Sequence, residues 1–368
     1  MGALRRILAL IRKELAALWK DPKTRGVILI PPLVQVMLFA YAATYDVTGV
    51  KLAVWNEDGG TQAAELVRRF DATPAFTVAA RVDNPDAARA VLDAKDVAAV
   101  LHVPQDFSAD VLAGRGGQAQ LLLDARRSNT ALVAGGYAAA IVAAYAQSLQ
   151  PNQRPPFELR TRFWFNPTLE SQWFILPGLV GIISMMMAML ISALSLARER
   201  ELGTIEQLLV TPLRPWEILV GKAVPGVVVG LIDANIAVAA ALLWFRLPFT
   251  GSFVALQAVL LLGMLAGVGI GLAISAIART QQQAMLGMFL FASPMIVLSG
   301  YASPVDNMPQ WVQTITLANP VRWLLVETRG LFLADMPPDI VLRNAWPMLP
   351  IAVLTLLVAG VAVRRAVT

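Results

Sequence analysis

Long runs of uncharged, apolar residues constrain this chain more than any other feature of its sequence. Five runs contain no Asp, Glu, Lys or Arg: Gly26 to Tyr45, Ser171 to Ala197, Leu247 to Ala278, Thr280 to Val305 and Asn344 to Val363. An α-helix rises about 1.5 Å per residue, so about 20 apolar residues cross the roughly 30 Å hydrocarbon core of a bilayer. The composition agrees, because 57% of the 368 residues are hydrophobic and only 15% are charged. The sequence therefore predicts a mainly α-helical, multi-pass membrane protein.

A sixth apolar run, residues 223–245, has Asp233 near its centre. A carboxylate at that depth costs about 2.5–3.5 kcal/mol, which the surrounding Leu, Ile, Val and Phe residues roughly offset. We therefore interpret this run as a span. The six predicted transmembrane helices are residues 26–45, 171–197, 223–245, 253–277, 281–302 and 345–363. The connection 306–343 is too polar to cross and predicts interfacial helices in the outer leaflet.

Basic residues lie mainly on one side of these six spans. The connections on that side, including residues 1–25, 198–222 and 364–368, carry 14 Lys and Arg, whereas the short connections opposite carry four. Positively charged connections stay in the cytoplasm, so both termini are predicted to be cytoplasmic. Residues 46–170 then lie outside, since long connections translocate regardless of charge. The net charge of +5 thus belongs to a membrane face, and we expect no nucleic-acid partner.

The leader, residues 1–25, has the pattern of an amphipathic helix. Its apolar residues recur at three- and four-residue steps: Leu4, Leu8, Ile11, Leu15 and Leu18. Such a helix lies in the membrane interface, and Asp21-Pro22 would end it.

The outer segment 46–170 changes period and predicts an α/β domain inserted between the first two spans. Four short stretches read as strands: 50–55, 76–82, 97–103 and 119–123. Helical patterns follow them at 62–70, 85–94 and 129–150. The segment contains no glycine-rich phosphate loop and no nucleophile motif, so we expect a binding or gating module.

Several chemistries are excluded by composition. There is no cysteine and a single histidine, His102, which removes thiolate and histidine metal sites. The only Gly-Lys pair followed by a small residue, Gly221-Lys222-Ala223, lacks the upstream glycine and the hydroxyl of a phosphate loop. We therefore predict no catalytic residue, no metal site and no cofactor held by this chain.

The cytoplasmic connection 198–222 is the most informative segment. It predicts a continuation of the second span, a break at Thr211-Pro212, and a short helix opened by Pro215 with Glu217 in its first turn. The pattern alone also fits a loop whose long side chains lie along the membrane surface.

This connection contains, in order, Arg198 and Glu199, Gly203 and Thr204, Glu206, Leu208 and Leu209, Thr211 and Pro212, and Gly221 and Lys222. It resembles the conserved loop of type-two ABC exporter permeases, in which Arg-Glu, Gly-Thr, Glu, two leucines, Thr-Pro and Gly-Lys follow in the same order. Further stretches are similar to that family: Arg12 to Leu15, Trp164 to Pro167, Pro294, Ser299-Gly300, Pro304, Met308-Pro309, Pro320 and Arg329-Gly330. The resemblance covers nearly the whole chain and is weakest in the outer segment.

The resemblance implies a six-span permease of a bacterial inner membrane that works as a dimer, either with a second copy of itself or with a related permease. It also implies separate ABC ATPase subunits, which bind ATP and Mg. Residues 198–222 would form the coupling and gate-helix region, in which Arg198, Glu201 and Glu206 are candidate polar contacts to the ATPase. Members with a large outer domain resemble multidrug exporters that act with periplasmic adaptor proteins. The implied cargo is a drug-like amphipathic molecule, and membrane lipid is a further partner. The alternatives are a lipid-linked or polysaccharide cargo, and a membrane-anchored interaction protein that transports nothing.

We interpret a second group of residues as part of a cargo path or gate: Asp233, Met185, Met189, Ser299 and Gly300. An intramembrane carboxylate indicates a functional site by default, although Asn235 nearby offers Asp233 a structural partner. The methionines suit an adaptable apolar path or ordinary packing. Because we find no second ionisable residue at membrane depth, the sequence disfavours a proton- or sodium-driven transporter. Gly263, Gly267 and Gly271 predict close helix packing within the subunit.

Overall fold

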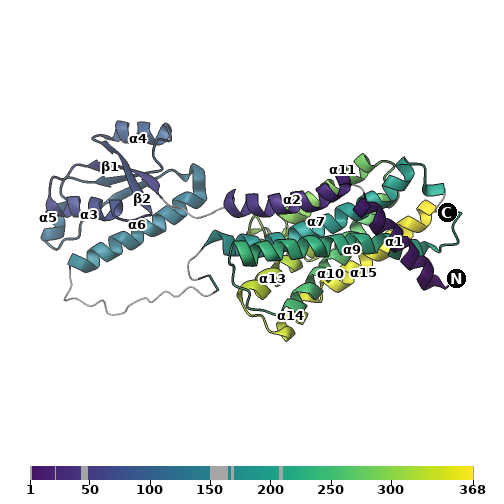
Figure 1. Ribbon diagram of the computed structural model, residues 1–368. Coiled ribbons are helices and arrows are strands. Elements are labelled where there is room, and N and C mark those ends of the chain that lie inside the picture. Colours follow the sequence, from purple (N-terminus) through teal and green to yellow (C-terminus); the bar gives the residue numbers. More distant parts are fainter. Residues whose placement is uncertain are drawn as a thin grey trace. The chain divides into compact units, whose positions relative to one another are not determined.

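The computed structural model describes residues 2–20, 22–42, 49–149, 165–166, 170–206 and 210–367. The chain divides into two compact units, one formed by residues 1–44 and 163–368 and the other by residues 45–162. The first unit is helical, and the second combines a sheet with helices (Figure 1).

The helical unit contains both long apolar helices and shorter helical elements. In chain order these are α1 (Ala3–Lys20), α2 (Pro22–Ala42), α7 (Ser171–Glu201), α9 (Pro215–Ala239) with its π-helical extension η2 (Ala240–Trp244), α10 (Phe253–Ile277), α11 (Gln281–Val297), η3 (Val305–Asn307), α12 (Gln310–Thr316), α13 (Pro320–Leu333), α14 (Pro338–Ala345) and α15 (Met348–Val367). Helix α1 ends at Lys20 and α2 begins at Pro22, the second residue of the predicted break at Asp21-Pro22. Asp21 itself lies outside the described residues.

Helix α7 is the centre of this unit and packs against α2, α9, α10, α11 and α13. Small residues on its neighbours let the backbones come close. A Cβ on Gly267 of α10 would lie 3.0 Å from Met185 Cγ, and a Cβ on Gly271 would lie 2.4 Å from the Met189 carbonyl oxygen. The glycine stripe of α10 therefore packs within the subunit, as its spacing predicts.

Among the residues that the structure describes, five helices are long and apolar enough to cross a membrane: Thr130–Leu149, Ser171–Glu201, Pro215–Trp244, Phe253–Ile277 and Pro338–Ala366. The last four cover predicted spans, and α10 has the bounds predicted for the fourth. The first is α6 of the second unit, which packs on a sheet there. The predicted spans 26–45 and 281–302 correspond to shorter helices, since the apolar part of α2 is Ile30–Tyr41 and α11 has 17 residues. Residues 43–45 of the predicted first span lie outside the described residues.

Two helices differ from the expectation drawn from sequence. Helix α9 begins at Pro215 and continues without interruption through Pro225, so the short helix and the third span are one element. Helix α13 lies within the predicted interfacial region 306–343, yet it packs deeply against α7 and α10. Its inward residues, including Leu324 and Phe332, are buried because they fill the space between those helices.

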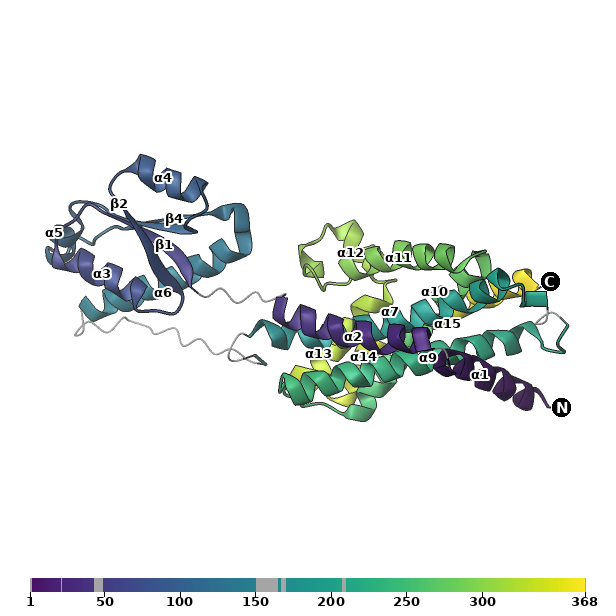
Figure 2. The same ribbon diagram turned by 45° about the horizontal axis from the view of Figure 1, so that its top comes forward.

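The second unit is built on a four-stranded sheet with the order β2-β1-β3-β4. Strands β1 (Val50–Asn56), β2 (Phe76–Val82) and β3 (Ala99–Val103) are parallel, and β4 (Gln120–Leu123) runs antiparallel to β3. The helical elements are α3 (Thr61–Asp71), α4 (Pro85–Asp93), α5 (Phe107–Leu112), η1 (Ala125–Arg127) and α6 (Ser128–Leu149). Helices α3 and α6 cover one face of the sheet and α4 covers the other (Figure 2).

Local interactions explain the ends of these elements. Asn84 accepts a hydrogen bond from the Ala87 amide at 2.7 Å and Pro85 follows it, so α4 has the predicted cap. Asp58, which is 8% exposed, accepts hydrogen bonds from the amides of Gly60 and Ser108 and thereby ties the start of α3 to α5. His102 stacks on Trp55 with ring centroids 3.7 Å apart. This packing gives the histidine a structural role.

Candidate functional site

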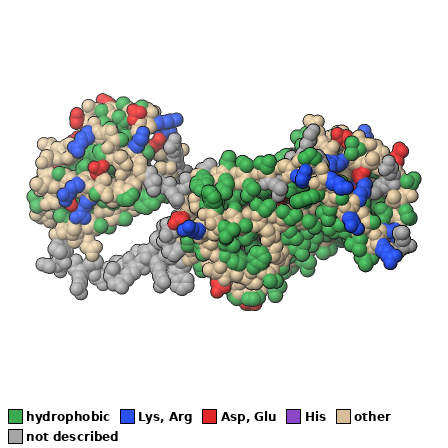
Figure 3. Space-filling model, in the orientation of Figure 1, with side chains coloured by type: hydrophobic (Ala, Val, Ile, Leu, Met, Phe, Trp, Pro, Cys, Tyr) green, Lys and Arg blue, Asp and Glu red, His purple; other side chains and the backbone are tan. Residues whose placement is uncertain are grey.

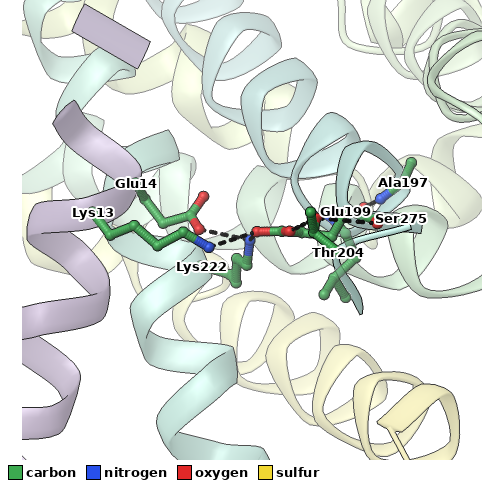
Figure 4. Close-up of polar contacts among 8 residues, drawn as sticks. Lys13, Glu14, Ala197, Glu199, Thr204, Lys222 and Ser275 are labelled. Carbon is green, nitrogen blue, oxygen red and sulfur yellow. Dashed lines mark hydrogen bonds and ion pairs between the residues drawn. The ribbon is translucent and has the colours of Figure 1, made fainter. Parts of the chain in front are cut away.

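A cluster of charged side chains in the helical unit surrounds Lys222, on the second turn of α9. Its side chain is 1% exposed, and its Nζ lies 2.7 Å from Glu14 Oε1 on α1 and 3.2 Å from Glu199 Oε1 on α7. Figure 4 shows the three side chains converging from three helices. Because a buried ammonium requires counter-charges, Lys222 fixes the relative positions of α1, α7 and α9.

Glu199 also accepts hydrogen bonds from the side chains of Lys13 and Thr204. Lys13 Nζ donates to Glu199 Oε1 at 3.0 Å, and the Thr204 hydroxyl donates to Glu199 Oε2. The cluster defined by Lys13, Glu14, Glu199, Thr204 and Lys222 is called the Lys222 cluster below (Figure 4). Lys13 is 59% exposed, so its interaction with Glu199 is weak compared with that of the buried Lys222.

The backbone at the end of α7 places Thr204 in this cluster. Gly203 has φ +70°, the left-handed conformation that glycine adopts without strain. The Thr204 amide then donates to the Glu199 carbonyl at 2.9 Å and the Gly203 amide to the Arg200 carbonyl at 3.1 Å. These are the two hydrogen bonds of a Schellman cap. The Gly-Thr pair recognised in the sequence therefore ends the helix and directs the threonine hydroxyl back to Glu199.

A second ion pair joins α1 to the start of α9. Arg6 Nη2 lies 2.6 Å from Glu217 Oε1, and the Glu217 side chain is 0% exposed. Glu217 Oε2 accepts the Arg214 amide at 2.8 Å, so the same carboxylate caps α9. Between the two ion pairs, a Cβ on Gly221 would lie 2.4 Å from Leu10 Cδ2, which shows how closely α1 approaches.

The contacts of α1 follow a single face of that helix. Arg6, Leu10 and Glu14 are four residues apart and meet Glu217, Gly221 and Lys222 of α9, respectively. Residues spaced by four lie on one helical face. The leader thus binds the rest of the helical unit through a polar stripe as well as through its apolar residues.

The remaining residues predicted for coupling occupy the surface beyond this cluster. Glu201 Oε2 accepts the Gln281 amide at 2.7 Å, which caps the start of α11. Glu206, Thr211 and Pro212 are exposed, and Arg198 borders a cavity described below. Leu208 and Leu209 lie outside the described residues. Of the residues predicted for coupling, the structure therefore brings together Glu199, Gly203, Thr204, Gly221 and Lys222. The other described residues of that set lie around an exposed turn.

Apolar side chains are exposed on this same turn. Leu202 is 67% exposed, Val210 is 84% exposed and Trp216 is 48% exposed. Exposed apolar residues next to charged ones are typical of an interaction surface. We call Leu202, Glu206, Val210, Thr211 and Pro212 the turn surface.

A cavity of about 580 Å³ adjoins the Lys222 cluster. Its wall has a charged part and an apolar part, formed by Lys13, Glu14, Arg198, Glu199 and Lys222 and by Leu18, Ile28, Leu190, Ile191, Leu194 and Met285, among others. Such a wall is complementary to an amphipathic molecule.

The residues predicted for a cargo path lie on three elements of the helical unit: α7, α9 and the turn after α11. Met185 and Met189 are buried between α7 and α10. Ser299 and Gly300 lie in the turn after α11, where Gly300 has φ +91°. Asp233 is 0% exposed on α9, and Asn235 bonds to Gln257 and the Leu231 carbonyl rather than to Asp233.

Sequence reasoning missed Arg6, Glu14, Glu217 and Glu327 as site residues. Glu327 of α13 is 0% exposed although the sequence around it predicts an interfacial helix. The four-residue repeat from Arg6 to Glu14 could have indicated a polar contact face on the leader. Among the described residues, no group of three or more His, Asp or Glu side chains is arranged to hold a metal ion.

Comparison with known proteins gives a consistent result. The family described as "ABC-2 family transporter protein" matches residues 26–361. "Probable multidrug ABC transporter permease YbhR" of Escherichia coli strain K12 is 40% identical over 364 residues, which are 98% of this chain and 99% of that protein. "Probable multidrug ABC transporter permease YbhS" of the same strain is 29% identical over 95% of this chain and 94% of its own length. "Inner membrane transport permease YhhJ", also from that strain, is 32% identical over 87% of this chain and 86% of its own length.

Proposed function

The chain belongs to the ABC-2 family of transporter proteins, and we propose that it is the permease subunit of an ATP-driven exporter in a bacterial inner membrane. Proteins of this family are membrane-embedded subunits of ABC transporters. ATP hydrolysis in such a transporter belongs to a partner subunit, so ATP and Mg would be bound there. The observation that carries the proposal is the Lys222 cluster, which links the leader, α7 and α9 (Figure 4). One of its members, Thr204, lies in the sequence between Leu202 and Glu206 of the exposed turn surface.

The proposed topology has six spans, with both termini in the cytoplasm and residues 46–170 as a periplasmic domain. Figure 3 supports it, since hydrophobic side chains cover the middle of the helical unit while Lys and Arg gather at the end where α1 and both termini lie. In this topology α2 and α11 supply the first and fifth spans. The apolar part of α2, Ile30–Tyr41, and the whole of α11 are short for a span, and proline lies inside each helix.

Coupling would begin at the turn surface. An ATPase subunit that pushes on Leu202 and Glu206 would move the end of α7, and the buried ion pairs of Lys222 would pass that displacement to α9 and α1. A packed ion cluster is suited to transmitting a displacement between helices, because breaking one of its buried ion pairs would be strongly destabilising. The paired side chains therefore move together. The partners of the proposed complex are ABC ATPase subunits, a second permease copy or a related permease, and a periplasmic adaptor protein.

A drug-like amphipathic molecule is the proposed cargo. Two relatives are named probable multidrug permeases, and the cavity beside the Lys222 cluster has both an apolar and a charged wall. That cavity lies at the end of the unit where the leader packs, which in the proposed topology faces the inner leaflet. Membrane lipid would compete for the same surface.

Inside-out membrane vesicles provide the test. The chain is purified from its own host in mild detergent to identify the co-purifying ATPase, and both are then expressed together. We expect ATP-dependent uptake of a fluorescent amphipathic dye that disappears when the ATPase carries a hydrolysis-blocking substitution. Uptake that persists with the inactive ATPase, or an intact permease that co-purifies with no ATPase, would refute the proposal.

A further inference from the structure

Two carboxyl side chains of the helical unit are buried without a hydrogen-bond partner among the residues that the structure describes. Asp233 of α9 and Glu327 of α13 are each 0% exposed. None of their four carboxyl oxygens has a hydrogen-bond partner among the described residues. Glu217, which is also 0% exposed, differs because it is paired with Arg6. Buried polar groups in proteins are normally satisfied, so two unsatisfied carboxyl groups in one helical unit need an explanation.

The position of Asp233 follows from the packing of α9. Gly230 lies one turn before Asp233 on the same face. A Cβ on Gly230 would be 2.9 Å from the Ser184 carbonyl oxygen of α7 and 3.0 Å from Met264 Sδ of α10. Asp233 therefore lies on the face of α9 that packs against α7 and α10.

Glu327 reaches the same two helices from α13. Leu324 lies one turn before it on the same face. A Cβ on Gly181 of α7 would be 2.9 Å from Leu324 Cγ, and a Cβ on Gly263 of α10 would be 3.0 Å from Leu324 Cδ1. Both carboxyl-bearing faces thus meet residues 181–184 of α7 and 263–264 of α10.

This level is close to the middle of the proposed spans. Gly181 is about ten residues from the start of α7, and Gly263 is about ten residues from the start of α10, which corresponds to about 15 Å along each helix. A hydrocarbon core is about 30 Å thick. Charged groups at that depth mark substrate and ion pathways, because hydrocarbon solvates them poorly.

The surroundings decide which ligand would fit. Met185 and Met264 are fully buried at this level and are flexible and polarizable. The nearest basic residue along α13, Arg329, is engaged elsewhere, because its guanidinium lies 3.7 Å from the centroid of the Phe174 ring. Two carboxyl groups without a third described metal-ligating side chain do not make a divalent-metal site.

We propose that Asp233 and Glu327 recognise a cationic cargo, namely an organic ammonium ion with apolar substituents. The N–H groups of the ammonium would donate to the carboxyl oxygens, and its apolar body would pack on Met185 and Met264. The helices enclose both carboxyl groups here, so the cargo would enter when α9 and α13 separate from α7. This inference rests on the proposed function and narrows its substrate class.

The test compares two dyes in the same inside-out vesicles carrying the permease with its ATPase. One dye is a protonated amine, and the other is a neutral molecule of similar size and apolarity. The ratio of their initial ATP-dependent uptake rates does not depend on the amount of folded protein. For Asp233→Asn and Glu327→Gln we expect this ratio to fall at least about tenfold, the effect of losing one hydrogen bond to a charged group. Asp339→Asn, at the exposed start of α14, is the matched control and should leave the ratio unchanged.

The outcomes separate this inference from the proposed function. If the wild-type complex transports only the neutral dye, or if both variants lose uptake of both dyes in equal proportion, cation recognition is refuted while export stands. An unchanged ratio in both variants likewise refutes it. Absence of ATP-dependent uptake of either dye by the wild-type complex would refute the exporter itself. Rescue by Asp233→Glu would support a charge requirement.

Discussion

Lys222 Nζ lies 2.7 Å from Glu14 Oε1, which joins the second turn of α9 to the leader helix across 208 positions of the chain. Lys222 is also bonded to Glu199 at the end of α7. One buried ammonium therefore holds together three helices that approach the turn surface. Its removal should affect both the stability of the helical unit and the transmission of movement through it.

Replacing Lys222 with methionine should destabilise the protein strongly. The substitution keeps most of the side-chain volume but leaves Glu14 and Glu199 without their shared cation, and breaking a buried ion pair costs about 3–5 kcal/mol. Thermal unfolding of the purified chain in detergent measures the effect. Lys13→Met is the matched control, because Lys13 is 59% exposed and an exposed ion pair contributes about 0–1 kcal/mol. Equal destabilisation by the two variants would contradict the role given to Lys222.

Substitution of Gly203 should weaken the end of α7. Gly203→Ala places a Cβ at φ +70° and should cost about 1 kcal/mol, while moving the Thr204 hydroxyl away from Glu199. The number of dye molecules exported per ATP hydrolysed should then fall. Gly203→Asn should cost less, since asparagine tolerates the left-handed region. If both variants export as efficiently as the wild type, the cap has no part in coupling.

Charge reversal at Glu206 should uncouple ATP hydrolysis from efflux. Glu206 is exposed and belongs to the turn surface, so Glu206→Arg changes a contact to the ATPase without disturbing packed residues. We expect normal amounts of protein in the membrane, continued ATP hydrolysis and reduced dye efflux. Unaltered efflux would remove Glu206 from the coupling surface.

The unit of residues 45–162 should lose stability in acid through Asp58. Burial by itself raises the pKa of this carboxyl, but hydrogen bonds from Ser108 and Gly60 outweigh that effect and the pKa is lowered. A lowered folded-state pKa means that the stabilisation is present above the unfolded-state pKa and is lost as the pH falls through the folded-state value.

Hydrogen exchange of the full chain in detergent measures this effect. Amides in α3 and α5 should become less protected between neutral pH and pH values below about 4. Asp58→Asn should lower their protection at neutral pH and reduce its dependence on pH. If the variant and the wild type show the same pH dependence, Asp58 is not the titrating group.

The elements of this protein follow closely from local sequence. The bounds of α10 coincide with the predicted span 253–277, β2 coincides with the predicted strand 76–82, and the cap of α4 is Asn84 as predicted. Apolar periodicity, β-branched residues and capping side chains act over a few positions, so they can be recognised without knowledge of the fold. The Gly-Thr pair at the end of α7 was recognised by resemblance to a family, and its geometry explains why those two residue types stand there.

Other features depend on neighbours that are distant in the chain. The sequence identifies Lys222 as part of a motif but not Glu14 or Glu199 as its partners, because the choice of partner depends on how α1 and α7 pack against α9. Likewise, the polar residues around α13 predict an interfacial helix, whereas its packing on Gly181 and Gly263 buries Glu327.

The sequence by itself determined that the chain crosses a membrane repeatedly and on which side of its spans the basic residues gather. It also determined where most helices and strands lie and to which family the chain belongs. The spans, the charge distribution and the local elements follow from hydrophobicity, charge and short-range backbone preferences, which are additive along a chain. The family was recognised from the resemblance of motifs such as those in residues 198–222. Only the tertiary structure decided which charges are neutralised and which remain buried without a partner. That outcome depends on the distance between groups and on the exclusion of water around them, and both arise only when the helices pack.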